Sequence, residues 1–100
     1  MTLKLNNNLE LSCISVVETK IQDYKGGIID CINIFFSEED KPLSELYSIF
    51  RNPENFSTLS VYKDNKELPL ENYNKIIEAC IVINDNKNIT SKICLKKTDE

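Results

Sequence analysis

Residues 77–95 read IEACIVI-NDNKN-ITSKICL. Apolar side chains occupy every second position of the first part, and the alternation resumes after the polar run 84–88. The alternating positions are Ile77, Ala79, Ile81, Ile83, Ile89, Ile93 and Leu95. Because successive side chains of a β-strand point to opposite faces, a period of two is typical of a strand with one buried face. Two such segments around a short turn rich in Asn and Asp predict a β-hairpin.

The same alternation predicts strands through much of the remaining chain. They cover residues 3–5, 9–21, 28–36, 57–63 and 67–70. The last is expected at a sheet edge, because Pro69 cannot donate a ladder hydrogen bond. A strand as long as 9–21 usually bends, and the Val16-Val17 doublet is the expected place for its alternation to change faces.

The only two glycines, Gly26 and Gly27, are adjacent and predict a tight turn that joins strands 9–21 and 28–36 into a second hairpin. If they are the two turn residues, Ile21 lies opposite Ile32 and Val17 lies opposite Phe36. The same register sets Asp23 against Asp30, which is unfavourable. A longer loop would relieve that repulsion, so the hairpin is predicted while its register stays open.

Residues 42–51 carry a helical pattern. Its apolar positions follow the spacing i, i+3, i+4 and i+7, and they are Leu43, Leu46, Tyr47 and Phe50. Pro42 suits the first position of a helix, and the acidic run 38–40 before it favours a helix N-terminus. Pro53 disfavours helical geometry in Asn52. We therefore expect one amphipathic helix from Pro42 to Arg51.

These elements predict a single α+β domain over residues 1–100. The expected architecture is a mainly antiparallel β-sheet or a small β-sandwich with the amphipathic helix packed on it. The expected core residues are Leu11, Ile21, Ile32, Ile34, Leu46, Phe50, Leu59, Val61, Ile81, Ile83, Ile93 and Leu95.

The charge of the chain bears on its partners. Lys and Arg number 12 against 16 Asp and Glu, which gives a net charge of −4. Proteins that bind nucleic acids are usually basic, so direct nucleic-acid binding is not expected. No apolar run is long enough to cross a membrane, and residues 1–8 lack the pattern of a signal peptide. We therefore expect neither a membrane span nor secretion.

The four cysteines are Cys13, Cys31, Cys80 and Cys94, and their spacing is wide. Structural zinc sites usually take their ligands in closely spaced pairs, and no C-x-x-C occurs, so no metal site is expected. Reduced, half-buried thiols are the expected state. Cys80 and Cys94 point to the same face of the 77–95 hairpin as opposite or diagonal neighbours, so a disulfide between them stays open as an alternative.

Catalytic and cofactor motifs are missing from the sequence. It contains no His, the commonest general base, and its two glycines form no phosphate-binding loop. We therefore expect a protein that is not an enzyme, with no catalytic residues and no cofactor. The acidic cluster 38–40 is typical of a solvated helix approach. Tyr62 alternates outward on its strand and is a candidate anchor for a partner.

The layout resembles small structural and tail-region proteins of bacteriophages and prophages of Gram-positive bacteria. The residues that carry the resemblance are 17–20, 30–34, 43–50, 59–62, Tyr73 and 93–95. The resemblance implies a non-enzymatic virion or assembly protein, and it transfers no catalytic residues. It also implies a location in the cytoplasm of the bacterial host before assembly, and in the virion if the protein is structural.

Two functions are therefore open. The first is a protein-interaction module, a phage or prophage structural or tail-assembly protein that associates with itself or with another virion protein. The alternative is a phage-encoded inhibitor of a host defence system, either an acidic nuclease inhibitor or a protein that sequesters a nucleotide. The candidate partner-binding residues are Glu38, Glu39, Asp40, Glu45 and Tyr62. Clustered carboxylates favour the inhibitor, whereas an apolar patch or an open strand edge favours assembly.

Overall fold

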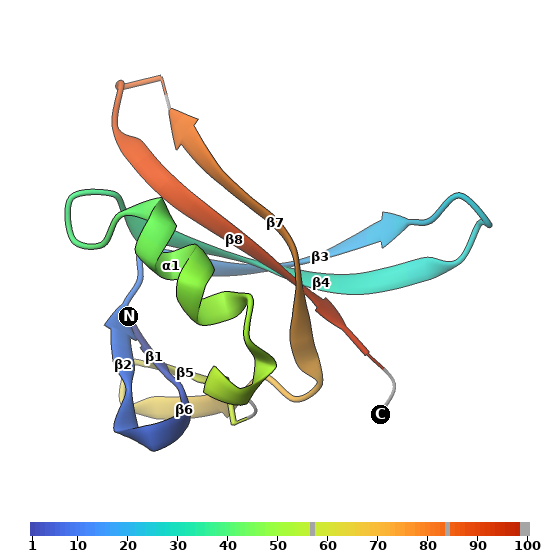
Figure 1. Ribbon diagram of the computed structural model, residues 1–100, viewed down its shortest axis with the longest axis horizontal. Coiled ribbons are helices and arrows are strands. Elements are labelled where there is room, and N and C mark those ends of the chain that lie inside the picture. The colour runs from blue at the N-terminus through green and yellow to red at the C-terminus, as the bar shows by residue number, and fades with distance from the viewer. Residues whose placement is uncertain (57, 84, 99–100) are drawn as a thin grey trace.

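A computed structural model describes residues 1–56, 58–83 and 85–98. Its strands form two antiparallel four-stranded sheets (Figure 1). Sheet A has the order β2-β1-β5-β6, with β1 Thr2–Lys4, β2 Glu10–Ser12, β5 Ser60–Lys63 and β6 Lys66–Pro69. Sheet B has the order β3-β4-β8-β7, with β3 Ser15–Gln22, β4 Ile28–Ser37, β7 Tyr73–Ile83 and β8 Ile89–Lys97. With the helix α1, Leu43–Phe50, the mostly β, α+β fold expected from the sequence is confirmed.

Helix α1 packs on β7 and β8 of sheet B. It begins directly after Pro42, which has extended backbone angles, and the Arg51 amide still donates to the Tyr47 carbonyl. Leu46 and Phe50 are fully buried, as the helical spacing predicts. Tyr47, on the flank of the same stripe, is 46% exposed. A single turn of 3₁₀-helix, Pro53–Asn55, follows α1, and another, Asn6–Asn8, joins β1 to β2.

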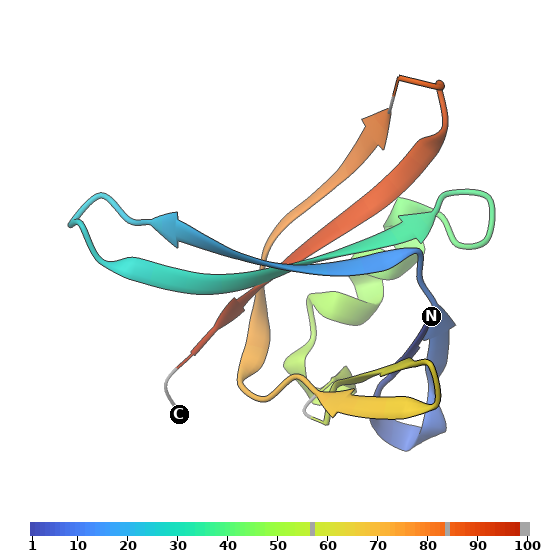
Figure 2. The same cartoon turned by 180° about the vertical axis from the view of Figure 1, so that it is seen from behind.

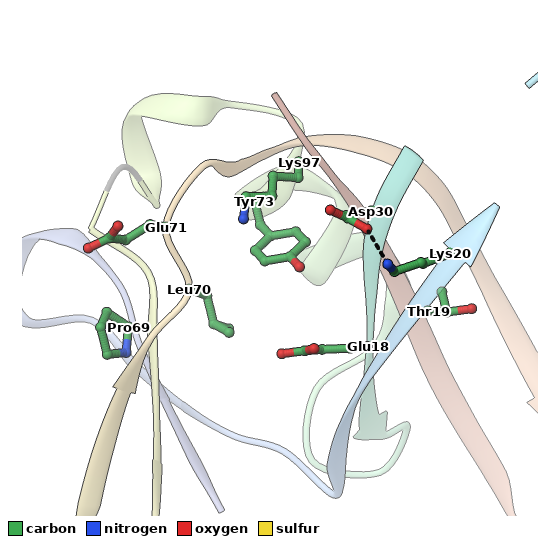
Figure 3. Close-up of a pocket in the computed structure, with 9 residues that line it drawn as sticks. All are labelled: Glu18, Thr19, Lys20, Asp30, Pro69, Leu70, Glu71, Tyr73 and Lys97. Carbon is green, nitrogen blue, oxygen red and sulfur yellow. Dashed lines mark ion pairs between the residues drawn. The ribbon is translucent and has the colours of Figure 1, made fainter. Parts of the chain in front are cut away.

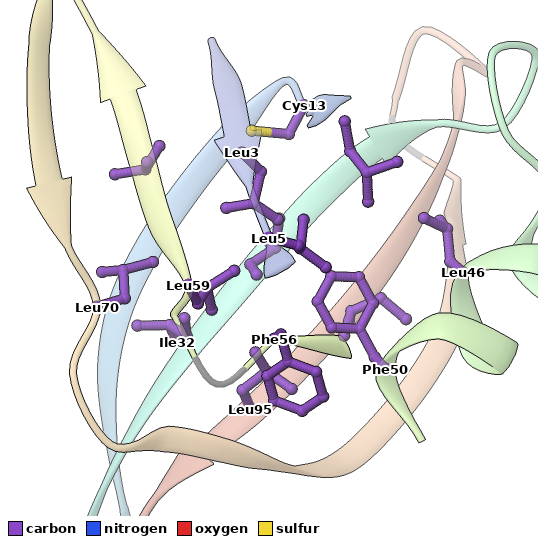
Figure 4. Packing of buried hydrophobic residues seen from close by; sticks show 14 of the residues in the cluster. Leu3, Leu5, Cys13, Ile32, Leu46, Phe50, Phe56, Leu59, Leu70 and Leu95 are labelled. Atoms are coloured by element: carbon purple, nitrogen blue, oxygen red, sulfur yellow. The ribbon is translucent and has the colours of Figure 1, made fainter. Parts of the chain in front are cut away.

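The hydrophobic core fills the space between the two sheets and α1 (Figure 4). Three aromatic rings lie at its centre: Phe50 is 6.1 Å from Phe36 and 5.4 Å from Phe56, measured between ring centroids. Most of the expected core is confirmed as buried. These residues are Leu11, Ile32, Ile34, Leu46, Phe50, Leu59, Val61, Ile93 and Leu95.

For three residues the prediction of a core position was wrong, because their side chains are exposed. Ile21 is 41% exposed, Ile81 49% and Ile83 65%. Both hairpins of sheet B extend past the core (Figures 1 and 2), and these side chains stand on the extended parts. For Ile81 and Ile83, alternation identifies the face of the strand, but it does not say how far along the strand that face is covered. Ala79, on the same face as Ile81 and Ile83, packs against the core. Ile21 lies opposite Ile29, on the face of sheet B away from the buried Ile32, because the register of its hairpin differs from the expected one.

The glycine-centred hairpin forms, but with the longer loop. Ile21 lies opposite Ile29 and Lys20 lies opposite Asp30, so the register that pairs Ile21 with Ile32 was wrong. The cause is the Asp23 side chain, whose Oδ1 accepts hydrogen bonds from the amides of Lys25 (2.9 Å) and Gly27 (2.8 Å). Gly26 takes a positive φ of 85°, which closes the loop 23–27.

The predicted strand 9–21 is two strands in two sheets. It breaks at Cys13 and Ile14, not at the Val16-Val17 doublet, and there the chain passes from sheet A to sheet B. The predicted strand 57–63 starts only at Ser60, and Ser57 lies outside the described residues. The short edge strand around Pro69 is confirmed as β6, at the edge of sheet A.

Candidate functional site

Three acidic candidates, Glu38, Glu39 and Asp40, lie in the segment between β4 and α1, and the fourth, Glu45, lies in the first turn of α1. Two of the four already have partners. The half-buried Glu38 accepts a hydrogen bond from the hydroxyl of Ser91 in β8, and Ser91 has no exposed surface. Glu45 in α1 forms an ion pair with Lys41, with 3.5 Å between Nζ and Oε2. Glu39 and Asp40 are exposed.

Tyr62 lies apart from these acids, on β5 of sheet A. It is half-buried, and the Lys4 ammonium is 4.7 Å from the centroid of its ring, a cation–π geometry. The five candidates chosen from the sequence therefore do not meet in one surface patch. Glu38 and Glu39 share a cleft with Lys87 and Ile89.

A larger cleft of about 750 Å³ lies at the other end of sheet B (Figure 3). Strands β3 and β4 contribute one wall, and the segment 69–71, Tyr73 and Lys97 line the other side. Its carboxylates are Glu18, Asp30 and Glu71, and its ammonium groups are Lys20 and Lys97. Sequence reasoning missed this cleft, because its charges come from segments that are far apart in the chain.

The electrostatics of the cleft favour neutral hydroxyls and cations over anions. Burial raises the pKa of the Tyr73 phenol, and the nearby Glu18 and Asp30 carboxylates and the Cys31 thiol raise it further. Lys97 lies 5.6 Å from the centroid of the Tyr73 ring, and Lys20 lies 3.9 Å from Asp30. A phosphate group entering the cleft would meet an excess of carboxylates.

Three thiols gather on the outer face of sheet B, the face turned away from α1 and sheet A. Cys31, Cys94 and Cys80 stand on β4, β8 and β7, and all are free. Burial raises the pKa of Cys94 to about 11, and the neighbouring Cys31 thiol contributes to the rise. Cys80 lies opposite Lys92 and Cys94 opposite Glu78, so Cys80 and Cys94 are diagonal neighbours and no disulfide joins them. In the part of the chain that the structure describes, no three His, Cys, Asp or Glu residues group in a way that could hold a metal ion.

Exposed apolar side chains mark the tips of both hairpins of sheet B. At the β7–β8 tip, Ile81, Ile83 and Ile89 are 49%, 65% and 49% exposed, and Ile83 pairs directly with Ile89. At the β3–β4 tip, Ile21 is 41% and Ile28 71% exposed. The tips therefore present apolar surface that no described element covers.

Comparisons with known proteins add no relative. No protein-family model, no curated protein and no solved structure matches this chain. None of the described helices has the length and apolar character needed to cross a bilayer.

Proposed function

We propose that this protein is a non-enzymatic interaction module that assembles with copies of itself or with another protein. The observation that supports this most is the uncovered part of sheet B, where the isoleucines at the β7–β8 tip stand beyond the core. Contiguous exposed apolar surface is uncommon in monomeric proteins and usually marks an interaction site.

The geometry of the tips strengthens this proposal. A two-stranded hairpin is only marginally stable on its own, so an extended tip gains from a surface that packs against it. Ile83 and Ile89 face each other across the strands and continue the row that begins with the half-buried Ala79 and the fully buried Ile93. A partner seated there would extend the core along the same face.

The resemblance to phage and prophage structural proteins suggests in which assembly such a module acts. A small virion or tail-assembly protein acts through surfaces of this kind, first in the cytoplasm of the bacterial host and then in the particle. Direct nucleic-acid binding is not part of the proposal, because the net charge is −4.

The alternative, inhibition of a host defence nuclease or sequestration of a nucleotide, has less support. A phosphate mimic needs several free carboxylates in one patch, whereas Glu38 is bonded to Ser91 and Glu45 to Lys41. The 750 Å³ cleft carries more carboxylates than ammonium groups, which disfavours a nucleotide.

Light scattering over a series of protein concentrations tests the proposal. The expected result is a mass above the 11.5 kDa of one chain, rising with concentration. In parallel, fluorescence anisotropy with a labelled nucleotide and a nuclease inhibition assay probe the alternative. A strict monomer that binds the nucleotide or inhibits the nuclease contradicts the assembly role.

A further inference from the structure

Strand β3 is the longest regular open edge of the described sheets. The other edges are blunted in ways that usually prevent strand addition. β2 has three residues, β6 ends in Pro69, and β7 contains register shifts near Lys75 and Ile76. β3 instead runs for eight residues in unbroken register with β4, its single partner among the described strands. In Figure 2 it lies at the front of sheet B, and no described element crosses in front of it.

The hydrogen bonds of the hairpin show which groups face the open side. The Asp23 amide donates to the Gly27 carbonyl at 2.8 Å, and in an antiparallel pair such bonded positions recur at every second residue. The odd-numbered residues of β3 therefore bond to β4. The even-numbered residues turn their N–H and C=O groups to the open edge, and these are Val16, Glu18, Lys20 and Gln22.

The sequence of β3, SVVETKIQ, is complementary to itself in one antiparallel register. We infer that β3 pairs with β3 of a second copy of this chain about a two-fold axis at Thr19. Glu18 then lies opposite Lys20 of the second copy, and the symmetry repeats this ion pair. Val17 lies opposite Ile21 of the second copy, and the symmetry repeats this apolar pair as well. Opposite charges and apolar neighbours both stabilise cross-strand pairs.

Neighbouring symmetric registers lack this match. A shift of the axis by one residue to Glu18 places the two Glu18 side chains opposite each other, and a shift to Lys20 does the same for the two lysines. Like charges directly opposite destabilise a strand pair. The charges of β3 therefore select the register centred on Thr19, in which even-numbered residues of both copies meet and exchange backbone hydrogen bonds.

The surroundings of β3 accommodate such a partner. Val17 and Ile21 are 48% and 41% exposed, and each would be covered by the other side chain from the second copy. The Lys20 side chain is 75% exposed and its Nζ lies 3.9 Å from Asp30, so it has room for a second carboxylate. The pairing would join two four-stranded sheets into one continuous sheet. This inference rests on the proposed assembly role and names one partner and one surface for it.

Charge reversal at two exposed positions tests the pairing. Glu18→Lys places lysines opposite lysines, and Lys20→Glu places glutamates opposite glutamates, so each single variant is expected to shift the dimer toward monomer in light scattering. A double variant that carries both changes restores opposite charges in the same register and should dimerise again. An equimolar mixture of the two single variants should form heterodimers. Far-UV circular dichroism checks that each variant is folded.

Amide hydrogen exchange of the wild type gives a second, residue-specific readout. The Val17 and Thr19 amides bond to β4 and are expected to be protected in both states, whereas the Glu18 and Lys20 amides should be protected only in the dimer. An oligomer that Glu18→Lys leaves intact, with fast exchange at Glu18, overturns the β3 pairing and leaves the assembly role in place. A wild type that stays monomeric at all concentrations overturns the β3 pairing and self-assembly, and it overturns the assembly role altogether if that monomer binds the nucleotide or inhibits the nuclease.

Discussion

The carboxylate of Glu38 accepts a hydrogen bond from the hydroxyl of Ser91, a side chain with no exposed surface. This bond holds the loop after β4 against β8, an inner strand of sheet B. An acidic residue that looked like part of a free anionic cluster therefore has a structural partner.

Ser91→Ala should destabilise the protein by about 1–3 kcal/mol, because it leaves the half-buried Glu38 carboxylate without its donor. Urea denaturation followed by circular dichroism measures the loss. Glu38→Gln is the matched variant, since its amide oxygen can still accept from Ser91, and it should cost less. An unchanged urea midpoint for Ser91→Ala would show that water replaces the hydroxyl.

Leu46→Ala should lower the free energy of unfolding by about 2–5 kcal/mol, because the Leu46 side chain on the inner face of α1 is completely buried. Leu68→Ala provides the control with the same chemical change, at a side chain that is 54% exposed on β6. Its cost should stay within roughly 1 kcal/mol. Equal midpoints for the two variants in urea would contradict the placement of α1.

Gly26→Ala should destabilise the β3–β4 hairpin by about 1–2 kcal/mol, because an alanine at a φ of 85° is strained. Thermal unfolding of the variant measures this loss. Asp23→Ala should also weaken the loop, since the amides of Lys25 and Gly27 lose their common acceptor. A melting temperature equal to that of the wild type in both variants would mean that the loop contributes nothing to stability.

The thiols are expected to react in a fixed order. Burial raises the pKa of both Cys80 and Cys94, and that of Cys94 reaches about 11. Cys80 is half-buried, whereas Cys31 and Cys94 are 0% and 5% exposed. Because the thiolate is the reactive form, iodoacetamide at pH 8 should modify Cys80 first and Cys94 only after unfolding. Mass spectrometry of the digested protein identifies the modified sites. Early labelling of Cys94 would show that sheet B opens readily.

The same raised pKa predicts a loss of stability in alkali. An unfolded thiol releases its proton near the ordinary pKa of 9.0, while Cys94 in the folded protein holds its proton until about 11. The folded state therefore binds more protons in this interval, and the free energy of unfolding falls as pH rises from about 9. Denaturation midpoints measured at pH 8 and pH 10.5 check this, and Cys94→Ala should flatten the dependence.

Local sequence patterns were enough to predict most of the strands and the helix. The division of the strands between two sheets, and their register, depends on contacts between distant segments. The 77–95 alternation and the spacing of Leu46 and Phe50 identified the last hairpin and the helix correctly. The register of β3 on β4 depends on a side-chain acceptor at Asp23, which the pair of glycines does not reveal. The break at Cys13 depends on β1, whose other neighbour in sheet A is β5, far away in the chain.

The candidate site was harder to predict than the fold. Glu38, Glu39 and Asp40 are adjacent in sequence, yet Glu38 is bonded to Ser91 on a strand more than fifty residues later. The charges of the cleft in Figure 3 meet only because the ends of β3, β4 and β8 converge there with segment 69–71. The self-complementarity of β3 was present in the sequence, but its significance required knowing that β3 lies at an edge.

Strand β1 occupies an inner position of sheet A, and Thr2, Leu3 and Lys4 pair with Tyr62, Val61 and Ser60. Strand β1 therefore stays without its second neighbour until β5 has been synthesised. Contacts between such distant segments form slowly, because the intervening chain must first be ordered. We expect sheet A to complete late in folding, so that until β5 is in place one edge of β1 presents unpaired backbone groups to other chains.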